Sequence, residues 1–292
     1  MEDKKKQRKK KYHIKKVLWA FFFLTPSLTG TMLFLFLPFL DAAGRSFYTA
    51  VGREFVGVSN YLTVLQNSAF HLAVKNTVRF ILICIPLLLL ISLFYTAVVS
   101  SLKKYAQAFK TLFLIPIAIP AASIVFLWKI FFHQSGMVNL FVIFMGGQKI
   151  DFMNTGRAFW VLVFSYIWKN TGYDMVLWLA GLAGIPVSYY EAAKIDGAGA
   201  LAQFYYITLS ELRPTIYITA VLSLVNSFKV FREAYLVGGN YPQDSIYMLQ
   251  HIFNNWFISL DIQKMCAAAV MMAGVILLFL LLLRKIDRNR EE

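Results

Sequence analysis

Residues 191–214 read EAAKIDGAGALAQFYYITLSELRP, a mixed polar and apolar segment in a chain that otherwise consists mainly of long apolar stretches. Ser188 lies three residues before Glu191. This spacing predicts a capping box, in which the serine hydroxyl and the glutamate carboxylate each accept a backbone N–H. We therefore expect a helix that begins at about residue 189.

A turn is predicted at Gly197 and Gly199, because glycine adopts left-handed backbone conformations without steric cost. A second helix is expected to follow over residues 200–209. Two short helices that meet at a glycine turn form a compact projection. Between two membrane spans, on the cytoplasmic side, such a projection is suited to contact with another protein.

Two short sequence motifs lie at fixed distances on either side of this turn. Three residues separate the Glu-Ala-Ala triplet at 191–193 from Gly197, and nine more separate Gly197 from the Ile-Thr-Leu triplet at 207–209. This pattern resembles the EAA loop of the permease subunits of ABC importers. Further residues are similar to the carbohydrate-uptake branch (maltose and glycerol-phosphate type) of that family: Ile185, Pro186, Tyr190, Ile195, Asp196 and Ala198. In one departure, Ser210 stands where the family usually has proline, and Pro214 follows four residues later.

The resemblance implies a role for this segment. In these permeases the helix that begins at the EAA residues docks in a cleft of a cytoplasmic ATPase. The residues implied to form the ATPase-coupling loop are Glu191, Ala192, Ala193, Ile195, Asp196, Gly197 and Leu209. Capping by Glu191 is compatible with docking. The aromatic residues 204–206 either pack against the chain's own helix ends, which we favour, or contact the ATPase.

The composition indicates a membrane protein. Of the 292 residues, 59% are hydrophobic and 16% aromatic, and the net charge is +14. In such a chain the excess of Lys and Arg marks the cytoplasmic face rather than a nucleic-acid surface. The two cysteines lie in apolar stretches, and the four histidines lack metal-ligand spacing. We expect no disulfide framework, no metal site and no cofactor in this chain.

Six membrane spans are expected, which predicts an all-α integral membrane protein with the EAA loop between spans four and five. The spans are predicted over residues 17–40, 77–100, 111–132, 158–183, 214–235 and 265–283. They form a single permease domain, 17–284, between a basic tail, 1–16, and a short C-terminal tail, 285–292. The basic tail is expected to lie against anionic lipid headgroups.

The distribution of positive charge predicts the orientation. With the N-terminus inside the cell, eighteen Lys and Arg residues lie in cytoplasmic segments and five in external loops. The positive-inside rule then places both termini, and the segment after Glu191, in the cytoplasm.

Polar residues in the later spans are candidates for a solute cavity, because polar groups at bilayer depth are costly and usually face a bundle interior. The residues we propose are Tyr166, Asn170, Tyr173, Ser223, Asn226 and Ser227. The first three recur at helical spacing and share a face. For any one residue, hydrogen bonding between helices is an equal alternative.

Charged residues also interrupt these spans. Lys169, Asp174 and Glu233 are expected to neutralise opposite charges nearby. Lys229 and Arg232 lie toward the external end of the fifth span, where snorkelling or a gate role is favoured. A cationic cavity for an acidic sugar is the open alternative.

The function implied is that of the membrane-spanning permease subunit of an ATP-driven sugar importer in a bacterial cell membrane. Residues 146–149, Gly-Gly-Gln-Lys, have neither the spacing nor the Ser or Thr of a phosphate-binding P-loop. The chain is therefore expected to be non-catalytic, with ATP and Mg bound by two partner ATPase subunits. The resemblance also implies a second, homologous permease subunit and an external solute-binding protein, and no nucleic-acid partner.

Other functions stay open. An ABC permease for another solute, such as a glycerol phosphodiester, a polyamine or an amino acid, would share the EAA loop. An ion-coupled secondary transporter would need an intramembrane carboxylate or inverted repeats, for which Asp174 and Glu233 are the only candidates. A membrane-embedded enzyme would need a catalytic constellation at one depth, and none emerges from the sequence.

Overall fold

The computed structural model describes residues 19, 21–102 and 106–288. The predicted basic tail, 1–16, lies outside this part of the chain. The described residues are mainly helical, and their β-structure is limited to an isolated bridge between Tyr48 and Phe55. They divide into two compact units, one containing residues up to Gln66 together with Leu260–Gly274, and the other Asn67–Ser259 with the residues from Val275 onward.

The first unit begins with a continuous 25-residue helical stretch, Phe21–Arg45, which contains a π-helical turn, η1 (Met32–Phe36), followed by α2 (Leu37–Arg45). The loop after it is closed by Asn60, whose side-chain amide donates to the carbonyls of Ser46 and Tyr48 at 2.8 and 3.0 Å. Asn60 belongs to α3 (Ser59–Leu65), and the first turns of α15 (Ile262–Arg288) complete the unit.

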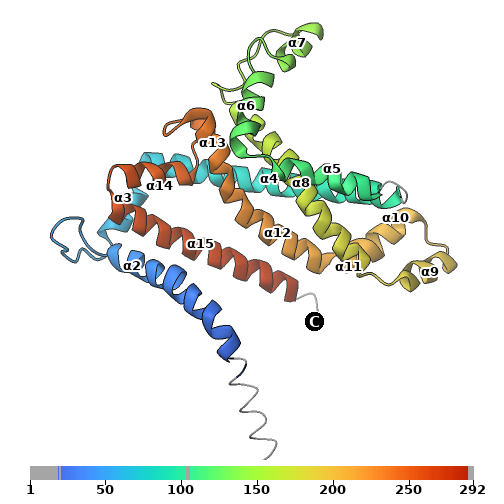
Figure 1. Cartoon of the computed structure of the whole chain (residues 1–292), viewed down its shortest axis with the longest axis horizontal. Helices are drawn as coiled ribbons and strands as arrows, with labels where there is room; N and C mark the ends of the chain where they lie inside the picture. Colours follow the sequence, from blue (N-terminus) through green and yellow to red (C-terminus); the bar gives the residue numbers. More distant parts are fainter. Residues whose placement is uncertain (1–18, 20, 103–105, 289–292) are drawn as a thin grey trace, which may run out of the picture. The chain divides into compact units, whose positions relative to one another are not determined.

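The second unit holds the remaining elements, labelled in Figure 1 where there is room. They are α4 (Ser68–Ser101), α5 (Ala106–Ala118), α6 (Ala121–Phe131), α7 (Met137–Phe144), α8 (Ala158–Ala183), α9 (Val187–Ile195), α10 (Ala200–Ala202), η2 (Gln203–Thr208), α11 (Leu209–Glu211), α12 (Arg213–Ser227), η3 (Phe228–Val230), α13 (Phe231–Gly238), η4 (Asp244–Ile246) and α14 (Leu249–Ile258).

Helix α8 is central to this unit, because α4, α5 and α12 all contact it. Its largest interface is with α4, where Phe80 meets Phe159 and Tyr166 edge to face at ring centroid distances of 6.4 and 5.4 Å. Cys84, Leu88, Leu162 and Val163 fill the same core. Burial of these apolar side chains against each other fixes α8 on α4.

Helix α5 approaches α8 at Gly172. A Cβ at that position would lie 1.9 Å from the carbonyl oxygen of Phe113, closer than any real carbon contact. Small residues permit such close backbone approach between membrane helices. Gly172 is therefore required by the packing of α5 on α8.

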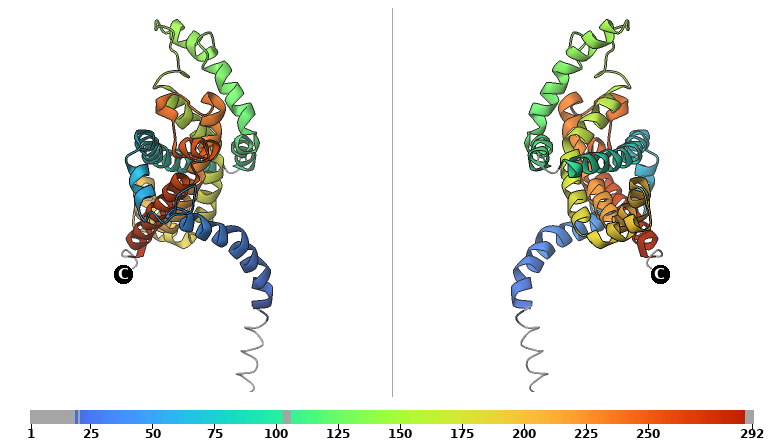
Figure 2. Two further views of the ribbon diagram at one scale, coloured as in Figure 1. Left: turned by 90° about the vertical axis from the view of Figure 1, so that its left-hand side faces the viewer. Right: turned by 90° about the vertical axis from the view of Figure 1, so that its right-hand side faces the viewer.

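The third predicted span, 111–132, is not one straight helix. Gln107–Ala118 and Ala121–Phe131 meet at an angle of 94°, and Figure 2 shows the bend. Pro120 stands at the break with an extended ψ of 140°. Proline also disfavours helical geometry in the residue before it, so the helix ends at Ala118.

Four helices in the described part of the chain are long and apolar enough to cross a membrane: Phe21–Arg45, Ser68–Ser100, Arg213–Gly238 and Ile262–Leu282. The bent pair α5 and α6 would make a fifth if it counts as one span. Helix α8, the fourth predicted span, is not among them, since polar residues from Lys169 to Asp174 interrupt its apolar sequence. The fold is thus an all-helical membrane protein with four or five apolar spans.

We expect Gly172→Ala to destabilise the protein, because the added methyl group forces α5 away from α8. Overpacking of this kind costs about 1–3 kcal/mol. The thermal unfolding temperature of the detergent-solubilised complex containing this chain would measure the loss. Gly274→Ala is the matched control, since nothing lies within 4 Å of a Cβ there. Equal stability of the two variants would contradict the close packing of α5 on α8.

Candidate functional site

Helix α9 begins earlier than the sequence predicted, and the predicted capping box is wrong. Pro186 is the N-cap residue, and α9 has no side-chain cap hydrogen bond at its start. Because the helix already includes Val187, Ser188 lies inside the first turn, where its hydroxyl is not placed to cap the helix. Glu191 is exposed and does not cap the helix.

Gly197 ends α9 with a Schellman motif. Its φ of +78° is left-handed. The N–H of Gly197 donates to the carbonyl of Lys194 at 3.1 Å, and the N–H of Ala198 donates to the carbonyl of Ala193 at 2.8 Å. These are the two hydrogen bonds that define the motif, and glycine adopts the required backbone without strain. The predicted turn therefore lies at Gly197.

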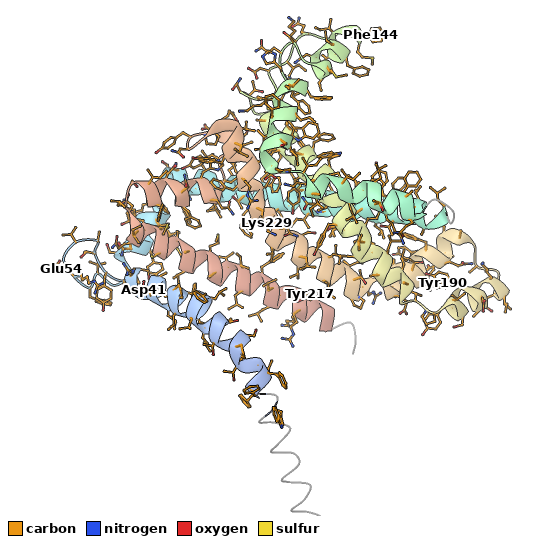
Figure 3. All side chains as sticks on the ribbon, in the orientation of Figure 1. Asp41, Glu54, Phe144, Tyr190, Tyr217 and Lys229 are labelled. Atoms are coloured by element: carbon orange, nitrogen blue, oxygen red, sulfur yellow. The ribbon has the colours of Figure 1, made fainter. Side chains whose placement is uncertain are left out.

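The second half of the projection is helical from Ala200, as predicted, but it contains the π-helical stretch η2 and continues to Glu211. Two hydrogen bonds tie it to α9 and to the turn. The Tyr190 and Thr208 hydroxyls lie 2.9 Å apart, and the Gln203 amide donates to the Ala198 carbonyl at 2.7 Å. We call residues 187–211 the coupling projection, after the role that the resemblance implies for them; Figure 3 labels Tyr190 within it.

The coupling projection is anchored to the helix bundle by a small apolar core. Trp178, Ile185 and Leu212 are buried there, and Tyr190 and Ile207 pack against them. Trp178 of α8 also donates from its indole Nε1–H to the Ser92 hydroxyl of α4 at 2.8 Å. The projection thus packs against Trp178 of α8, which is in turn hydrogen-bonded to α4.

The opposite side of the coupling projection is exposed. Of the residues assigned to the coupling loop, Ala193 and Leu209 are half-buried and the others are exposed: Glu191, Ala192, Ile195, Asp196 and Gly197. Ile195 has 87% of its surface exposed. The aromatic residues 204–206, which we expected to pack on the chain's own helices, are exposed as well.

A separate cavity of about 320 Å³ opens within the second unit. It is lined by Ile117 of α5, four residues of α8 and five from the end of α12 through α13: Tyr166, Lys169, Asn170, Tyr173, Asn226, Lys229, Val230, Arg232 and Glu233. The volume lies at the lower end of the range of small-molecule sites. Amide, phenol and charged groups converge in it.

Four of the six residues predicted for the solute cavity line it, and two serines do not. Ser223 is buried and its hydroxyl donates to the Asp174 carboxylate at 3.0 Å, while its carbonyl accepts from Tyr166 Oη at 3.1 Å. Ser227 donates to the Leu224 carbonyl of its own helix at 2.7 Å. In the structure both serines make hydrogen bonds within the helix bundle.

Charged residues, for which a cationic cavity was the open alternative, also line the cavity. Lys169 Nζ and Glu233 Oε1 form an ion pair of 2.8 Å across α8 and α13. Lys229 and Arg232 lie one turn apart, and Figure 3 labels Lys229 where α12 meets α13. The i, i+3 and i, i+4 spacing of Lys229, Arg232 and Glu233 was the signal in the sequence that these residues share a face.

Residues 80–292 match a family of binding-protein-dependent transport system inner membrane components. The chain belongs to this family.

This permease has relatives of similar length. It is 30% identical to a probable ABC transporter permease protein of Bacillus subtilis over 81% of each chain. It is 27% identical to the trehalose/maltose transport system permease protein of Thermococcus litoralis, over 94% of this chain and 95% of the relative.

A solved structure shares the fold. A chain of a bacterial ABC transporter involved in import of the acidic polysaccharide alginate superposes with a TM-score of 0.82 at 22% sequence identity, over 95% of this chain and 98% of that one. The protein is therefore a multi-pass inner-membrane permease of an importer that depends on a binding protein.

We expect Lys169→Met to destabilise the permease, because Glu233 would remain as a buried carboxylate without its partner. Side-chain exposures of 18% and 10% leave little water to replace the lysine. Breaking a buried pair in this way costs about 3 kcal/mol. Thermal unfolding of the solubilised complex would measure it, and Lys169→Met combined with Glu233→Gln should recover most of the loss. Failure of this recovery would show that the two side chains act independently.

Proposed function

We propose that this permease imports a sugar or oligosaccharide, which an external solute-binding protein delivers. Its relatives include the trehalose/maltose permease and the fold neighbour from the alginate importer. The cavity supports the same class of solute. Asn170, Tyr173 and Asn226 offer donors and acceptors suited to sugar hydroxyls, and Tyr173 offers an aromatic ring.

The observation that carries the proposed mechanism is the direct attachment of the coupling projection to the helix that lines the cavity. Trp178 anchors the projection, and Tyr173 of the same helix lines the cavity five residues earlier. Five residues of helix span about 7.5 Å. A displacement of the projection is therefore transmitted to the cavity wall by one rigid element.

In this mechanism two partner ATPase subunits bind ATP and Mg, and each permease of a heterodimer docks its coupling projection in one of them. Glu191, Ala192, Ala193 and Gly197 contact the ATPase, and Asp196 and Leu209 support the shape of the contact surface. Ile195 belongs to the same loop. ATP-driven closure of the ATPases rocks the spans and exchanges the external opening for an internal one. This chain holds no cofactor of its own.

The proposed topology has six spans, with both ends and the coupling projection in the cytoplasm. Helix α8 is the remaining span, because 26 residues reach about 39 Å, more than the hydrocarbon thickness. Its polar middle faces the cavity, where water and solute replace lipid.

The carboxylates count against an ion-coupled transporter. Asp174 is 1% exposed and accepts from the Ser223 hydroxyl, and Glu233 is paired with Lys169. Asp174 does not line the cavity, and the charge of Glu233 is balanced by Lys169. An ABC importer of another solute remains the nearer alternative.

Copurification and uptake test the function together. A tag on this permease should recover an ATPase and a second permease from membranes, and deletion of the chain should abolish uptake of at least one carbohydrate from a mixed carbohydrate medium. Recovery without an ATPase, or unchanged carbohydrate uptake, would overturn the proposal.

Glu191→Ala should reduce solute-stimulated ATP hydrolysis by the purified importer at least tenfold, because the exposed carboxylate contacts the ATPase. The stability of the permease should change by no more than about 0.5 kcal/mol, as for surface positions without special contacts. Glu211→Ala is the matched control, an exposed glutamate of the same projection outside the EAA pattern. Equal hydrolysis by the two variants would show that Glu191 has no coupling role.

Gly197→Ala should weaken coupling through the shape of the projection. A left-handed backbone costs a residue with a Cβ about 1–2 kcal/mol, so the turn loosens or shifts. Gly199→Ala provides the control, because Gly199 has a φ of −69° and open space around it. ATP hydrolysis per solute transported should rise for the first variant only. A parallel rise in both variants would argue against the Schellman turn as the cause.

A further inference from the structure

The cavity carries an excess of positive charge. Four ionisable groups with charges at neutral pH line it: Lys169, Lys229, Arg232 and Glu233. Lys169 and Glu233 neutralise each other in their 2.8 Å ion pair. Two positive charges therefore remain, and both lie on the wall formed by η3 and α13.

Neither remaining cation has a negatively charged partner among the described residues. Lys229 Nζ donates to the neutral amide oxygen of Asn226 at 2.7 Å. The ion pairs found in this part of the chain join Arg45 to Asp41, Lys169 to Glu233, and Lys264 to Asp261. The carboxylate among the lining residues, that of Glu233, is thus already paired with Lys169, and Arg232 lines the cavity without an ion-pair partner among the described residues.

Two cations within a candidate membrane span need either an opposite charge or a water-filled cavity beside them. The span Arg213–Gly238 has 26 residues, and Lys229 lies about 24 Å along it by the rise of an α-helix. Charged groups within membrane segments face water-filled cavities or pair with opposite charges, and they mark solute pathways. A guanidinium in particular offers a planar fork of N–H donors that fits a carboxylate or a phosphate.

We infer that the solute of this permease is anionic, and that Lys229 and Arg232 bind its carboxylate or phosphate group in the cavity between α8 and α13. The neutral groups on the facing wall, Asn170 and Tyr173, then bind the hydroxyls of the same solute. The inference rests on the proposed import of a carbohydrate and narrows its chemical class to acidic sugars or sugar phosphates.

Two other roles are open to Lys229 and Arg232: contact with lipid headgroups, or ion pairs with the second permease. Each role predicts a different experimental outcome. If Lys229 and Arg232 only extend their charges toward lipid headgroups, solute charge is irrelevant to transport. If they pair with carboxylates of the second permease, their replacement should disrupt assembly of the complex for all solutes alike. Both outcomes are distinguished by the experiments below.

The first experiment identifies the charge of the solute. Cells with and without this chain are grown on a mixture of neutral oligosaccharides, uronic-acid oligosaccharides and hexose phosphates, and depletion of each class from the medium is followed by mass spectrometry. We expect deletion to abolish depletion of uronic-acid oligosaccharides or of hexose phosphates, and these two arms distinguish carboxylate from phosphate. Loss confined to neutral sugars overturns the anionic solute but leaves the sugar importer standing. If depletion of all three classes continues in the deletion strain, both proposals fail.

The second experiment assigns the charge recognition to the cavity. For the acidic probe found above, Arg232→Gln and Lys229→Gln should each raise the KM of uptake about tenfold, the size expected for one charge-assisted hydrogen bond. Arg232→Lys should raise the KM by less than Arg232→Gln, because the positive charge remains although the planar fork of N–H donors is lost. Lys149→Gln is the matched control, since it removes one positive charge from an exposed loop outside the cavity. The amount of assembled complex should be unchanged in all variants. Unchanged KM, or loss of assembly instead of affinity, overturns the assignment.

Discussion

The packing of α8 on α4, fixed toward the C-terminal end of α8 by Trp178, is the interaction on which the rest of the structure depends. The indole is 1% exposed, and its N–H donates to the Ser92 hydroxyl of α4. Around it, Leu212 and Ile185 close a core that also holds Tyr190 of the coupling projection. The same helix provides the polar wall of the cavity. One well-packed element therefore connects the surface proposed for the ATPase with the site proposed for the solute.

Polar groups in this protein fall into two kinds according to their partners. Asp174, Ser223 and the hydroxyl of Tyr166 satisfy one another inside the bundle, where an unpaired polar group would be costly. Lys229 and Arg232 face a cavity instead and have no carboxylate partner among the described residues. The first kind holds the helices together, and the second kind remains available for a ligand. This division explains why polar residues that are close together in the sequence have different partners in the structure.

Local sequence signals failed where a proline imposed a different boundary. Pro186 begins α9 before Ser188, which removes the predicted capping box, and Pro120 breaks the third span with a bend of 94°. In both places the proline ring restricts its own backbone and that of the residue before it. The predicted glycine turn at Gly197 was confirmed, because a left-handed residue at a helix end is a requirement that a sequence reveals directly.

The sequence by itself determined the class of this protein. Its apolar stretches predicted a helical membrane protein, and the residues from Glu191 to Leu209 carried the resemblance to importer permeases, because both signals depend on residues close together in the chain. Helical spacing also showed that Tyr166, Asn170 and Tyr173 share a face. Only the tertiary structure decided what that face meets. Lys169 and Glu233 are 64 residues apart in the chain and Ser223 and Asp174 are 49 apart, and periodicity within one helix carries no information about which helix packs against it.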